Sequence, residues 1–496
     1  MSASTDWEYA PAPESEAIGR VKERYLPFID GKFIEGGGDD LVTVNPGRGE
    51  PLSTVSTVDE ADLDSAVRAA RRAYDGPWSK LSGAERGKYL FRIARGIAER
   101  SRELAVLESL DNGKPIKETR DFDIPTVAQH FFYHAGWADK LGHLGYGPDP
   151  RPLGVAGQVI PWNFPLLMAA WKIAPALAAG NTVVIKPAET TPLTALVLAE
   201  IIADADLPPG VVNVITGAGE IGAALVRHPG LDKVAFTGST AVGKQTQQAL
   251  AGTGRKLTLE LGGKGANIVF ADAAVDQAVE GIVNGIFFNS GQVCCAGSRL
   301  LVQEPIAEEL ITRLTERVET LRVGDPLDKN TDVGAINSQA QWDKITELTR
   351  AGIDEGAEVW RSSCPLPDKG FFVSPTIFTG TTQTMRIARE EIFGPVLSVI
   401  TFRTPDEAVA KANNTPYGLS AGVWTEKGSK AMAMAARLQA GVIWDNTWNR
   451  FDPAAPFGGY QESGFGREGG PSGLAAYLDT DDEPLLHDDG APELIR

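Results

Sequence analysis

Short β-branched runs alternate with helical segments along most of this chain, and this alternation constrains its fold more than any other feature. Four such runs follow Pro152, separated by segments of helical periodicity, and they lie at 155–160, 182–185, 211–215 and 233–236. Strands that alternate with helices predict a parallel sheet covered by helices. A second alternation starts near Asn267 and continues with a strand at 299–302, a helix at 306–321 and a strand at 442–444. The sequence therefore predicts an α/β fold with two sheet-containing domains.

Three further segments flank or precede these alternations. Helical spacing from Asp59 to about Leu110, with a break at Asp75-Gly76-Pro77, predicts two amphipathic helices. The polar, acidic stretch at 1–20 predicts a flexible N-terminal tail. Residues 479–496 hold seven acids and one arginine, which predicts a disordered or loosely attached C-terminal tail.

Charge and composition exclude several classes of partner. Acidic residues outnumber basic ones by 65 to 47, and the formal net charge is −18. Such a charge repels phosphate backbones and anionic membrane surfaces, so we expect neither nucleic acid nor lipid as a partner. The longest apolar region is interrupted by Lys172 and Pro175, so it lacks the run of about 20 apolar residues that a membrane span needs. With no signal-like N-terminal segment and only three cysteines, two of them adjacent, the sequence favours a cytoplasmic protein.

The adjacent cysteines, Cys294 and Cys295, lie on a predicted loop between a helical run and the strand at 299–302. Reactive groups are often placed on loops between rigid elements. Taken alone, a cysteine pair is more often two small buried hydrophobic side chains. Other segments must decide between these interpretations.

Two polar residues supply chemistry that a reactive cysteine needs. Asn163 lies in the turn Pro161-Trp162-Asn163-Phe164-Pro165, where two prolines restrict the backbone, so its amide could donate to a developing oxyanion. A local turn role for Asn163 is equally common. Glu260 ends a predicted strand beside Gly262 and Gly263 and could act as a general base, although such a carboxylate is more often solvated or paired with a lysine.

The five histidines favour a carboxylate base over a Cys/His pair, because none is near the cysteines in sequence. His130 and His134 have the i, i+4 spacing of a metal pair, but no third ligand accompanies them. We therefore predict no metal site and place both histidines on a helix surface.

A glycine-containing turn after the strand at 233–236 predicts an anion site. The segment Phe236-Thr237-Gly238-Ser239 leads from a strand to a helix N-terminus, where backbone N–H groups can bind phosphate. The pattern approaches the P-loop of nucleotide hydrolases and phosphotransferases, but Gln245 replaces the hydroxyl residue that would bind Mg²⁺. Two nucleotide-binding interpretations therefore remain open for the chain: a P-loop phosphotransferase and an inactive nucleotide-binding scaffold.

Seven motifs, in order, resemble the aldehyde dehydrogenase superfamily, in its NAD-dependent, hydrolytic type. They are PWNFP (161–165), KPAE (186–189), FTGS (236–239), ELGGK (260–264), GQVCCAGSR (291–299), EEIFGPV (390–396) and PFGGY (456–460). The resemblance extends from about Tyr25 to Tyr477. It implies a Rossmann-like NAD-binding domain at 21–140 and 152–262, a catalytic domain at 263–462 and a return segment at 463–478.

The resemblance also implies residue roles. Cys294 would be the nucleophile and Cys295 a packing residue, with Asn163 in the oxyanion hole and Glu260 as the base for the thiol or the hydrolytic water. Relatives that transfer the acyl group to coenzyme A tend to lack this carboxylate, so hydrolysis to the free acid is expected. The implied cofactor-binding residues are Trp162, Lys186, Glu189, Gly238, Ser239, Glu391 and Phe393.

The cofactor and substrate expectations follow from these positions. A carboxylate at Glu189 accepts hydrogen bonds from a ribose 2′-hydroxyl and repels a 2′-phosphate, so NAD is favoured over NADP. An apolar, aromatic entrance is expected for a small-molecule aldehyde, lined by Phe164, Met168, Trp171, Trp448, Phe451 and Phe457.

Two departures from the family pattern bear on assembly. The region 141–151 looks too short and glycine-rich for the hairpin that pairs subunits in many relatives. The charged stretch from Asp479 to Glu483 replaces the family's last strand. The expected assembly is therefore a homodimer, with a monomer as the alternative, and the family's usual tetramer is in doubt.

Overall fold

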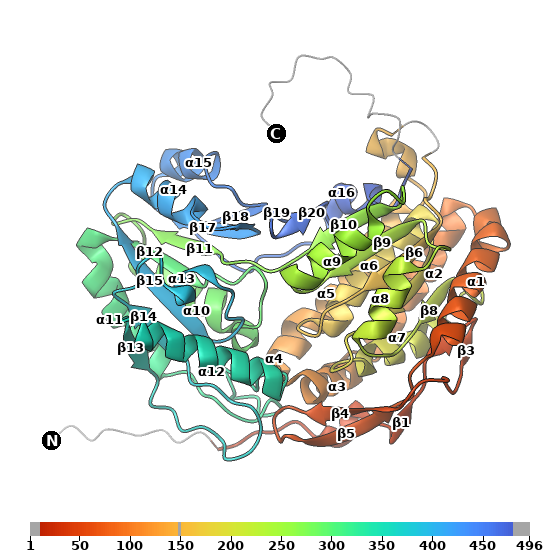
Figure 1. Cartoon of the computed structure of the whole chain (residues 1–496), viewed down its shortest axis with the longest axis horizontal. Coiled ribbons are helices and arrows are strands. Elements are labelled where there is room, and N and C mark those ends of the chain that lie inside the picture. Colours follow the sequence, from red (N-terminus) through yellow and green to blue (C-terminus); the bar gives the residue numbers. More distant parts are fainter. Residues whose placement is uncertain (1–9, 147–149, 480–496) are drawn as a thin grey trace.

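Two large sheets in two lobes make up the computed structural model, which describes residues 10–146 and 150–479 (Figure 1). The first sheet has eight strands, and its five central strands, β10, β9, β6, β7 and β8, are parallel neighbours. In spatial order the strands are β20 (Gly464–Phe465), β10 (Lys256–Glu260), β9 (Lys233–Thr237), β6 (Val155–Val159), β7 (Thr182–Lys186), β8 (Val212–Val214), β2 (Phe28–Ile29) and β3 (Lys32–Phe33). The four β-branched runs predict this parallel core correctly.

Helices cover both faces of the first sheet because successive strand residues point to opposite sides. Val155 packs in one apolar cluster with α1 (Glu60–Asp75), α8 (Gly219–Arg227) and α9 (Thr240–Leu250). Its neighbour Ala156 belongs to a second cluster on the other face. The helices of that face are α2 (Gly83–Glu99), α3 (Ser101–Asn112), α5 (Ile124–Trp137), α6 (Pro165–Ala179) and α7 (Leu193–Asp204).

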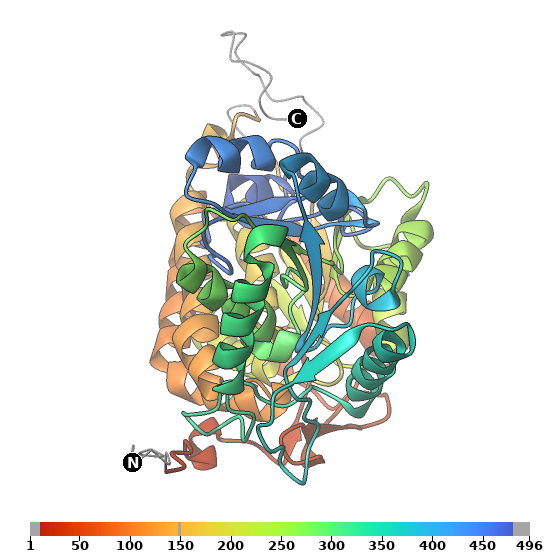
Figure 2. The same ribbon diagram turned by 90° about the vertical axis from the view of Figure 1, so that its left-hand side faces the viewer.

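The second sheet forms the other lobe, which Figure 2 turns toward the viewer. Its seven strands are parallel except for the edge strand β13. In spatial order they are β13 (Glu358–Arg361), β14 (Thr376–Thr379), β15 (Val396–Phe402), β12 (Arg299–Gln303), β11 (Ala266–Val269), β17 (Ser420–Trp424) and β18 (Val442–Asp445). The helices of this lobe are α10 (Val275–Phe287), α11 (Ala307–Glu319), α12 (Gln339–Asp354), α13 (Arg386–Arg389), α14 (Pro405–Asn413) and α15 (Gly428–Ala435). Residues 261–265 alone separate β10 from β11, so the chain passes directly from one sheet to the other.

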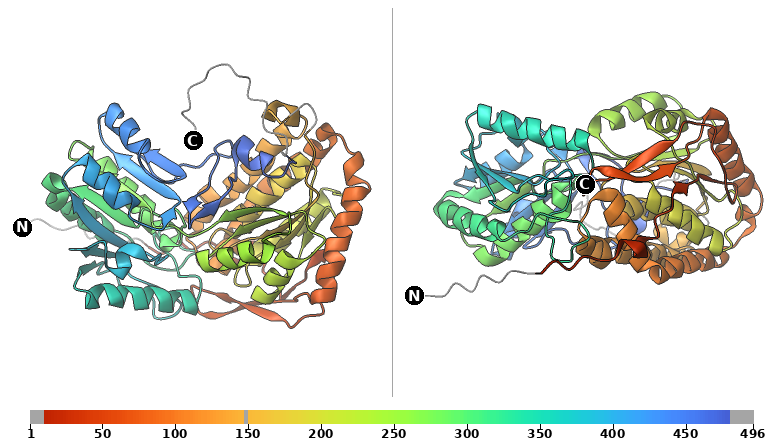
Figure 3. Two further views of the ribbon diagram at one scale, coloured as in Figure 1. Left: turned by 45° about the horizontal axis from the view of Figure 1, so that its top comes forward. Right: turned by 90° about the horizontal axis from the view of Figure 1, so that it is seen from below.

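A three-stranded sheet of β1 (Arg24–Tyr25), β5 (Glu50–Val55) and β4 (Leu41–Asn45) lies at the lower edge of the first lobe (Figure 1). The turn between β4 and β5 contacts the second lobe, because Phe371 N donates to Pro46 O at 3.0 Å. Two further views show the lobes side by side (Figure 3). A two-stranded sheet of β16 (Tyr417–Gly418) and β19 (Tyr460–Gln461) completes the pairing.

Two sequence expectations about helices are corrected. The region 59–110 holds three helices, not two, because the chain breaks again at Arg100, between α2 and α3. The predicted helix at 306–321 begins as a 3₁₀ turn, η6 (Glu304–Ile306), before α11. The predicted break at Gly76 is present at the end of α1.

Part of the N-terminal segment is better ordered than expected. Residues 10–20 include the 3₁₀ helix η1 (Glu16–Gly19), and Gly19 packs so closely on α3 that an added Cβ would lie 3.1 Å from Val106. The expectation of a flexible tail is therefore wrong for residues 10–20, while residues 1–9 lie outside the described part. The segment 463–478 returns to the first lobe, where β20 pairs antiparallel with β10 and α16 (Gly470–Ala475) packs on α6. Most of the predicted acidic tail, 480–496, lies outside the described residues.

In the region 141–151, where many relatives have a subunit-pairing hairpin, the described residues contain no strand. Leu141–Leu144 form the short 3₁₀ helix η4. Pro152, just after this region, pairs through an isolated bridge with Leu478. Among the helices that the structure describes, none is both long and apolar enough to cross a membrane.

Candidate active site

A cavity that opens to solvent lies where the carboxyl ends of β6, β9 and β10 face the loop that carries Cys294, and together with its open mouth it spans about 1070 Å³. Carboxyl ends of parallel strands are the usual place for a ligand in α/β folds. The cavity brings together residues predicted from widely separated motifs. Those in its wall are Trp162, Asn163, Phe164, Met168, Trp171, Gly238, Ser239, Glu260, Cys294, Glu391, Phe393, Phe451 and Phe457.

Asn163 follows β6 in a proline-bracketed turn, and Pro165 begins α6. Its side chain is buried, and its Nδ2 donates to the carbonyl of Gln292 at 2.9 Å. A side-chain amide nitrogen carries two hydrogens, so one N–H remains for a ligand in the cavity. This arrangement can support an oxyanion.

Glu260 is the last residue of β10, and its buried side chain is part of the cavity wall. Neither carboxylate oxygen has a hydrogen-bond partner in the described part of the chain. Burial, and then the nearby Glu468 carboxylate, raise the pKa of Glu260 well above its usual range, while Lys172 acts in the opposite direction. A carboxylate that is unpartnered and more basic than usual is suited to remove a proton from a thiol or a water.

Cys294 lies between the 3₁₀ turn η5 (Phe288–Gly291) and β12, and it is only partly buried, whereas Cys295 is fully buried. The adjacent Cys295 thiol, acting through a hydrogen bond, and burial raise the pKa of Cys294 well above its usual range. The thiol is therefore protonated at neutral pH without a ligand. Because the thiolate is the nucleophile, a base in the same cavity is needed.

The glycine-containing turn forms as predicted between β9 and α9. Ser239 caps the helix by accepting from Val242 N at 3.4 Å. An added Cβ at Gly243 would lie 2.4 Å from Leu261, so glycine lets the helix approach β10 closely. Gly238 and Ser239, which lead into α9, line the cavity, so the N-terminal end of this helix adjoins the cavity edge.

The second lobe contributes a second group of polar and aromatic residues. Glu391 Oε1 accepts from Gly263 N at 2.9 Å, and burial raises the pKa of Glu391. Phe393 has a positive φ of 60°, and Gln341 Nε2 donates to its carbonyl at 2.9 Å. Its ring meets that of Trp162 edge-on, with 5.3 Å between ring centroids. Both lobes therefore form the wall at this point.

Lys186 and Glu189 lie outside the cavity wall, at and just after the end of β7, beside β6. Their side chains form an ion pair of 3.6 Å. Lys186 is buried, and burial lowers its pKa, whereas the Glu189 side chain is 49% exposed. The exposed Glu189 carboxylate lies at the same sheet edge as Gly238, and beside its ion pair it keeps acceptor positions for a ligand.

Trp448 is not in the cavity wall, which corrects its assignment to the substrate entrance. Its ring is 1% exposed and fills space left by Gly285, Gly297 and Gly422. The sequence around it, Trp448-Asn449-Arg450-Phe451, does not indicate that the Trp448 ring turns inward. Neighbouring Asn449 and Phe451 do line the cavity.

The cavity also contains residues that the sequence did not single out. Phe122 and Phe288 meet edge-on, with 5.4 Å between ring centroids, and both are in the wall. Gln341, Lys344 and Glu468 are polar members of it. None belongs to a motif that suggests chemistry, and only the fold brings them to the site.

The two histidines proposed for a helix surface are buried instead. His130 and His134 lie in α5 with stacked rings 6.1 Å apart, and burial lowers their pKa values to about 3 and about 4. His130 packs against Trp171, which explains why it is inside. Within the described ranges, no group of three or more potential ligands could hold a metal.

The family model described as "Aldehyde dehydrogenase family" matches residues 33–482 of the chain. The chain belongs to the aldehyde dehydrogenase family. Retinal dehydrogenase 2 from Gallus gallus is 48% identical to this aldehyde dehydrogenase over 449 residues, which are 88% of the chain and 86% of the relative.

Solved structures agree over nearly the whole fold. The aldehyde dehydrogenase from Bacillus cereus, solved as an NAD⁺ complex, is 41% identical with a TM-score of 0.90, covering 95% of this chain and 98% of that one. The indole-3-acetaldehyde dehydrogenase of P. syringae, solved with NAD⁺ and IAA, is 40% identical with a TM-score of 0.90, covering 94% and 97%. The predicted α/β fold is confirmed.

This aldehyde dehydrogenase is an oxidoreductase that uses NAD and converts an aldehyde to a carboxylic acid. The phosphotransferase and inactive-scaffold alternatives receive no support from these comparisons.

Proposed function

We propose that Cys294, Glu260 and Asn163 carry out the oxidation within the one cavity. The observation that supports this most directly is that all three line the same cavity as the Gly238 turn. Glu260 takes the thiol proton, and the sulfur of Cys294 adds to the carbonyl carbon of the aldehyde. The carbonyl oxygen becomes an oxyanion, which the free N–H of Asn163 and the backbone N–H of Cys294 stabilise.

The second half of the reaction is hydrolysis. The chemistry that NAD would supply when bound is hydride acceptance; as the hydride leaves the tetrahedral carbon, the carbonyl re-forms as a thioester on Cys294. Once Glu260 has released the thiol proton to solvent, it removes a proton from water. The hydroxide adds to the thioester carbon, the carbon–sulfur bond breaks, and the acid leaves while the Cys294 thiolate takes up a proton. An unpartnered carboxylate with a raised pKa suits both proton transfers.

The residues around the cavity fit NAD. The domain at 21–140 and 152–262 would hold the dinucleotide, with Gly238 and Ser239 at the pyrophosphate and Lys186 and Glu189 at the adenosine ribose. Glu391, Phe393 and Trp162 would contact the nicotinamide ribose and ring. Glycine at position 262 lets the Glu391 carboxylate lie close to the end of β10, since a Cβ there would lie 2.4 Å from Glu391 Oε2. The domain at 263–462 would supply the nucleophile.

The substrate is an apolar aldehyde with an aromatic or long hydrocarbon group. Beside Trp162 and Phe393, which we place at the nicotinamide, seven other aromatic or thioether side chains line the cavity and support this class: Phe122, Phe164, Met168, Trp171, Phe288, Phe451 and Phe457. The names of two relatives, a retinal dehydrogenase and an indole-3-acetaldehyde dehydrogenase, are consistent with it. We further propose a cytoplasmic homodimer, which light scattering would report at twice the chain mass of 52.9 kDa.

Activity over an aldehyde panel tests this function. NADH absorbance is followed with short aliphatic, long aliphatic, aromatic and carboxylated aldehydes, and Cys294→Ser serves as the control. We expect the highest kcat/KM with aromatic or long apolar aldehydes and no turnover in Cys294→Ser. A preference for carboxylated aldehydes would reject the substrate class, and turnover in Cys294→Ser would reject the covalent mechanism.

A further inference from the structure

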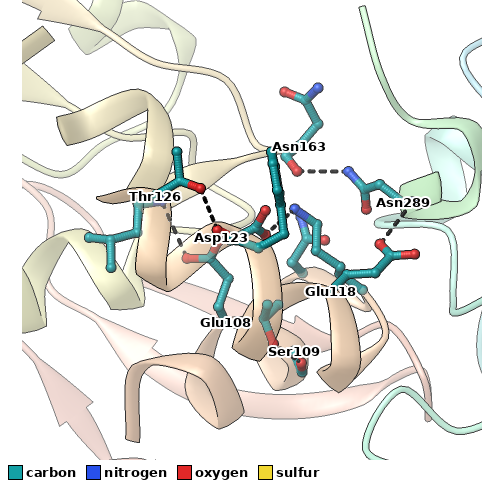
Figure 4. Close-up of polar contacts among 12 residues, drawn as sticks. Glu108, Ser109, Glu118, Asp123, Thr126, Asn163 and Asn289 are labelled. Atoms are coloured by element: carbon teal, nitrogen blue, oxygen red, sulfur yellow. Dashed lines mark hydrogen bonds and ion pairs between the residues drawn. The ribbon is translucent and has the colours of Figure 1, made fainter. Parts of the chain in front are cut away.

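Asn289 lies where the loop of Asn163 meets the loop of Cys294 (Figure 4). Its Nδ2 donates to the backbone carbonyl of Asn163 at 2.8 Å and to that of Gln292 at 3.2 Å. The same Gln292 carbonyl accepts from the Nδ2 of Asn163 at 2.9 Å. One buried amide therefore connects the residue proposed for the oxyanion with the segment that leads to the nucleophile.

The orientation of this amide follows from its surroundings. Asn289 is fully buried, and rotating the amide by half a turn would place Oδ1 against two carbonyl oxygens. The backbone of Asn289 also accepts from Gln292 N at 2.9 Å, which closes a compact turn before Cys294. The Gln292 carbonyl is therefore fixed in two ways: its residue closes the turn through Asn289 O, and the carbonyl oxygen accepts from the side chains of Asn163 and Asn289.

The turn has an unusual backbone. Asn289, Ser290 and Gly291 all have positive φ, at 48°, 53° and 74°. Each non-glycine residue in this region costs on the order of 1–3 kcal/mol, and such conformations persist where surrounding contacts hold them. Asparagine tolerates the left-handed region better than most residues, so backbone conformation alone is one explanation for its presence.

A buried carboxyl group supports the turn from the other lobe. Glu118, the last residue of α4 (Ile116–Glu118), accepts from Asn289 N at 2.9 Å through Oε2 (Figure 4). Burial raises the pKa of Glu118 to about 8, so the group is mainly a neutral acceptor at pH 7. The nearby Lys114 Nζ pairs with Asp123 at 2.6 Å and stands 3.7 Å from the ring centroid of Phe164. This polar cluster therefore contacts the cavity wall through Phe164.

We propose that Asn289 is a positioning residue that aims the free N–H of Asn163 at the oxyanion, with Glu118 holding Asn289 in place. The inference rests on the proposed role of Asn163. One hydrogen of the Asn163 amide goes to the Gln292 carbonyl, so the direction of the other depends on where that carbonyl and the Asn163 backbone lie. Asn289 fixes both. A displacement of about 1 Å at such a donor can lower a rate about a hundredfold.

Asn289→Gly tests the proposal because glycine keeps the left-handed backbone and removes only the amide. We expect kcat to fall about tenfold to a hundredfold, with the aldehyde KM and the NADH Kd changed less than about twofold, because the lost contact acts on the transition state. Ser290→Gly is the matched control, since its hydroxyl has no hydrogen-bond partner in the described structure. It should retain kcat. Wild-type kcat in Asn289→Gly would overturn the proposal.

A double variant separates positioning from general loosening of the site. If Asn289 acts through Asn163, then Asn163→Ala with Asn289→Gly should lose no more activity than Asn163→Ala alone. If the fold-losses in kcat of the two single variants multiply in the double variant, the inference is overturned. Wild-type activity in Asn163→Ala would instead reject the oxyanion assignment under the proposed function, so the two failures are distinguishable.

Glu118 provides a second pair of variants in case Asn289→Gly does not fold. Glu118→Gln keeps a neutral acceptor for Asn289 N and should retain most of kcat, whereas Glu118→Ala should lower kcat about tenfold at unchanged NADH Kd. Equal kcat in the two variants would overturn the supporting role of Glu118, and a loss confined to KM would overturn the positioning argument.

Discussion

At the scale of single residues, the proposed chemistry depends on Glu260, a buried carboxylate without a partner among the described residues. The base works in its deprotonated form, and burial together with Glu468 raises its pKa. Decay of the acyl-enzyme should therefore slow as pH falls through that raised pKa and reach its maximum above it. In Glu260→Gln the decay should be slower by about 10²–10⁴-fold and independent of pH. Quenched-flow mass measurement of acylated Cys294 follows this step alone, because the thiol no longer titrates once acylated.

Coenzyme choice is also decided by one residue. Glu189 is half-exposed and would repel a 2′-phosphate, so Glu189→Gln should raise kcat/KM for NADP about tenfold relative to NAD. Initial rates with each coenzyme give this ratio. Glu316→Gln, an exposed acid on α11 in the other lobe, is the control and should leave the ratio unchanged. An unchanged ratio in Glu189→Gln would remove this carboxylate from the ribose site.

The sequence predicts which residues reach the cavity where a motif restricts both the backbone conformation and the type of side chain. Asn163 is bracketed by prolines, Cys294 follows Gly291 at fixed spacing, and Glu260 precedes two glycines, and all three reach one cavity. Trp448 and His130 could not be placed in this way. Whether a large side chain faces a cavity or fills a core depends on partners such as Gly422 and Trp171, which are distant in sequence.

At the scale of elements, close packing of β17 on Trp448 gives a stability prediction. A Cβ at Gly422 would lie 2.3 Å from Cζ3 of the Trp448 ring, which is fully enclosed and cannot move aside. Gly422→Ala should therefore lower the free energy of unfolding by about 1–3 kcal/mol, measured by urea denaturation. Gly428→Ala, at the start of α15 with open space around it, should show no loss. Equal stability of the two variants would contradict the packing.

Helices and strands could be predicted where the hydrophobic periodicity of a segment and its length indicate the same type of element. The four runs that become β6, β7, β8 and β9 are short, β-branched and bounded by turns, so they read as buried parallel strands. The division between α2 and α3 was missed because apolar spacing continues across Arg100 while the backbone leaves the helical region there. The π-turn at Thr119–Asp123, which brings Phe122 to the cavity, has no periodic signature.

At the scale of the whole molecule, the cavity is built from both lobes, and NAD should therefore stabilise them together. Gly238 and Ser239 come from the first lobe, and Glu391 and Phe393 from the second. At a free NAD concentration of 100 times Kd, binding adds about 2.7 kcal/mol to the free energy of unfolding. Cys294→Ser protein, which cannot turn over, should melt a few degrees higher with NAD in differential scanning calorimetry. Glu391→Ala should reduce this shift at the same NAD concentration, because the second lobe then contributes fewer contacts. A shift of full size in Glu391→Ala would mean that the first lobe holds the dinucleotide alone and that residues 263–462 supply only the nucleophile.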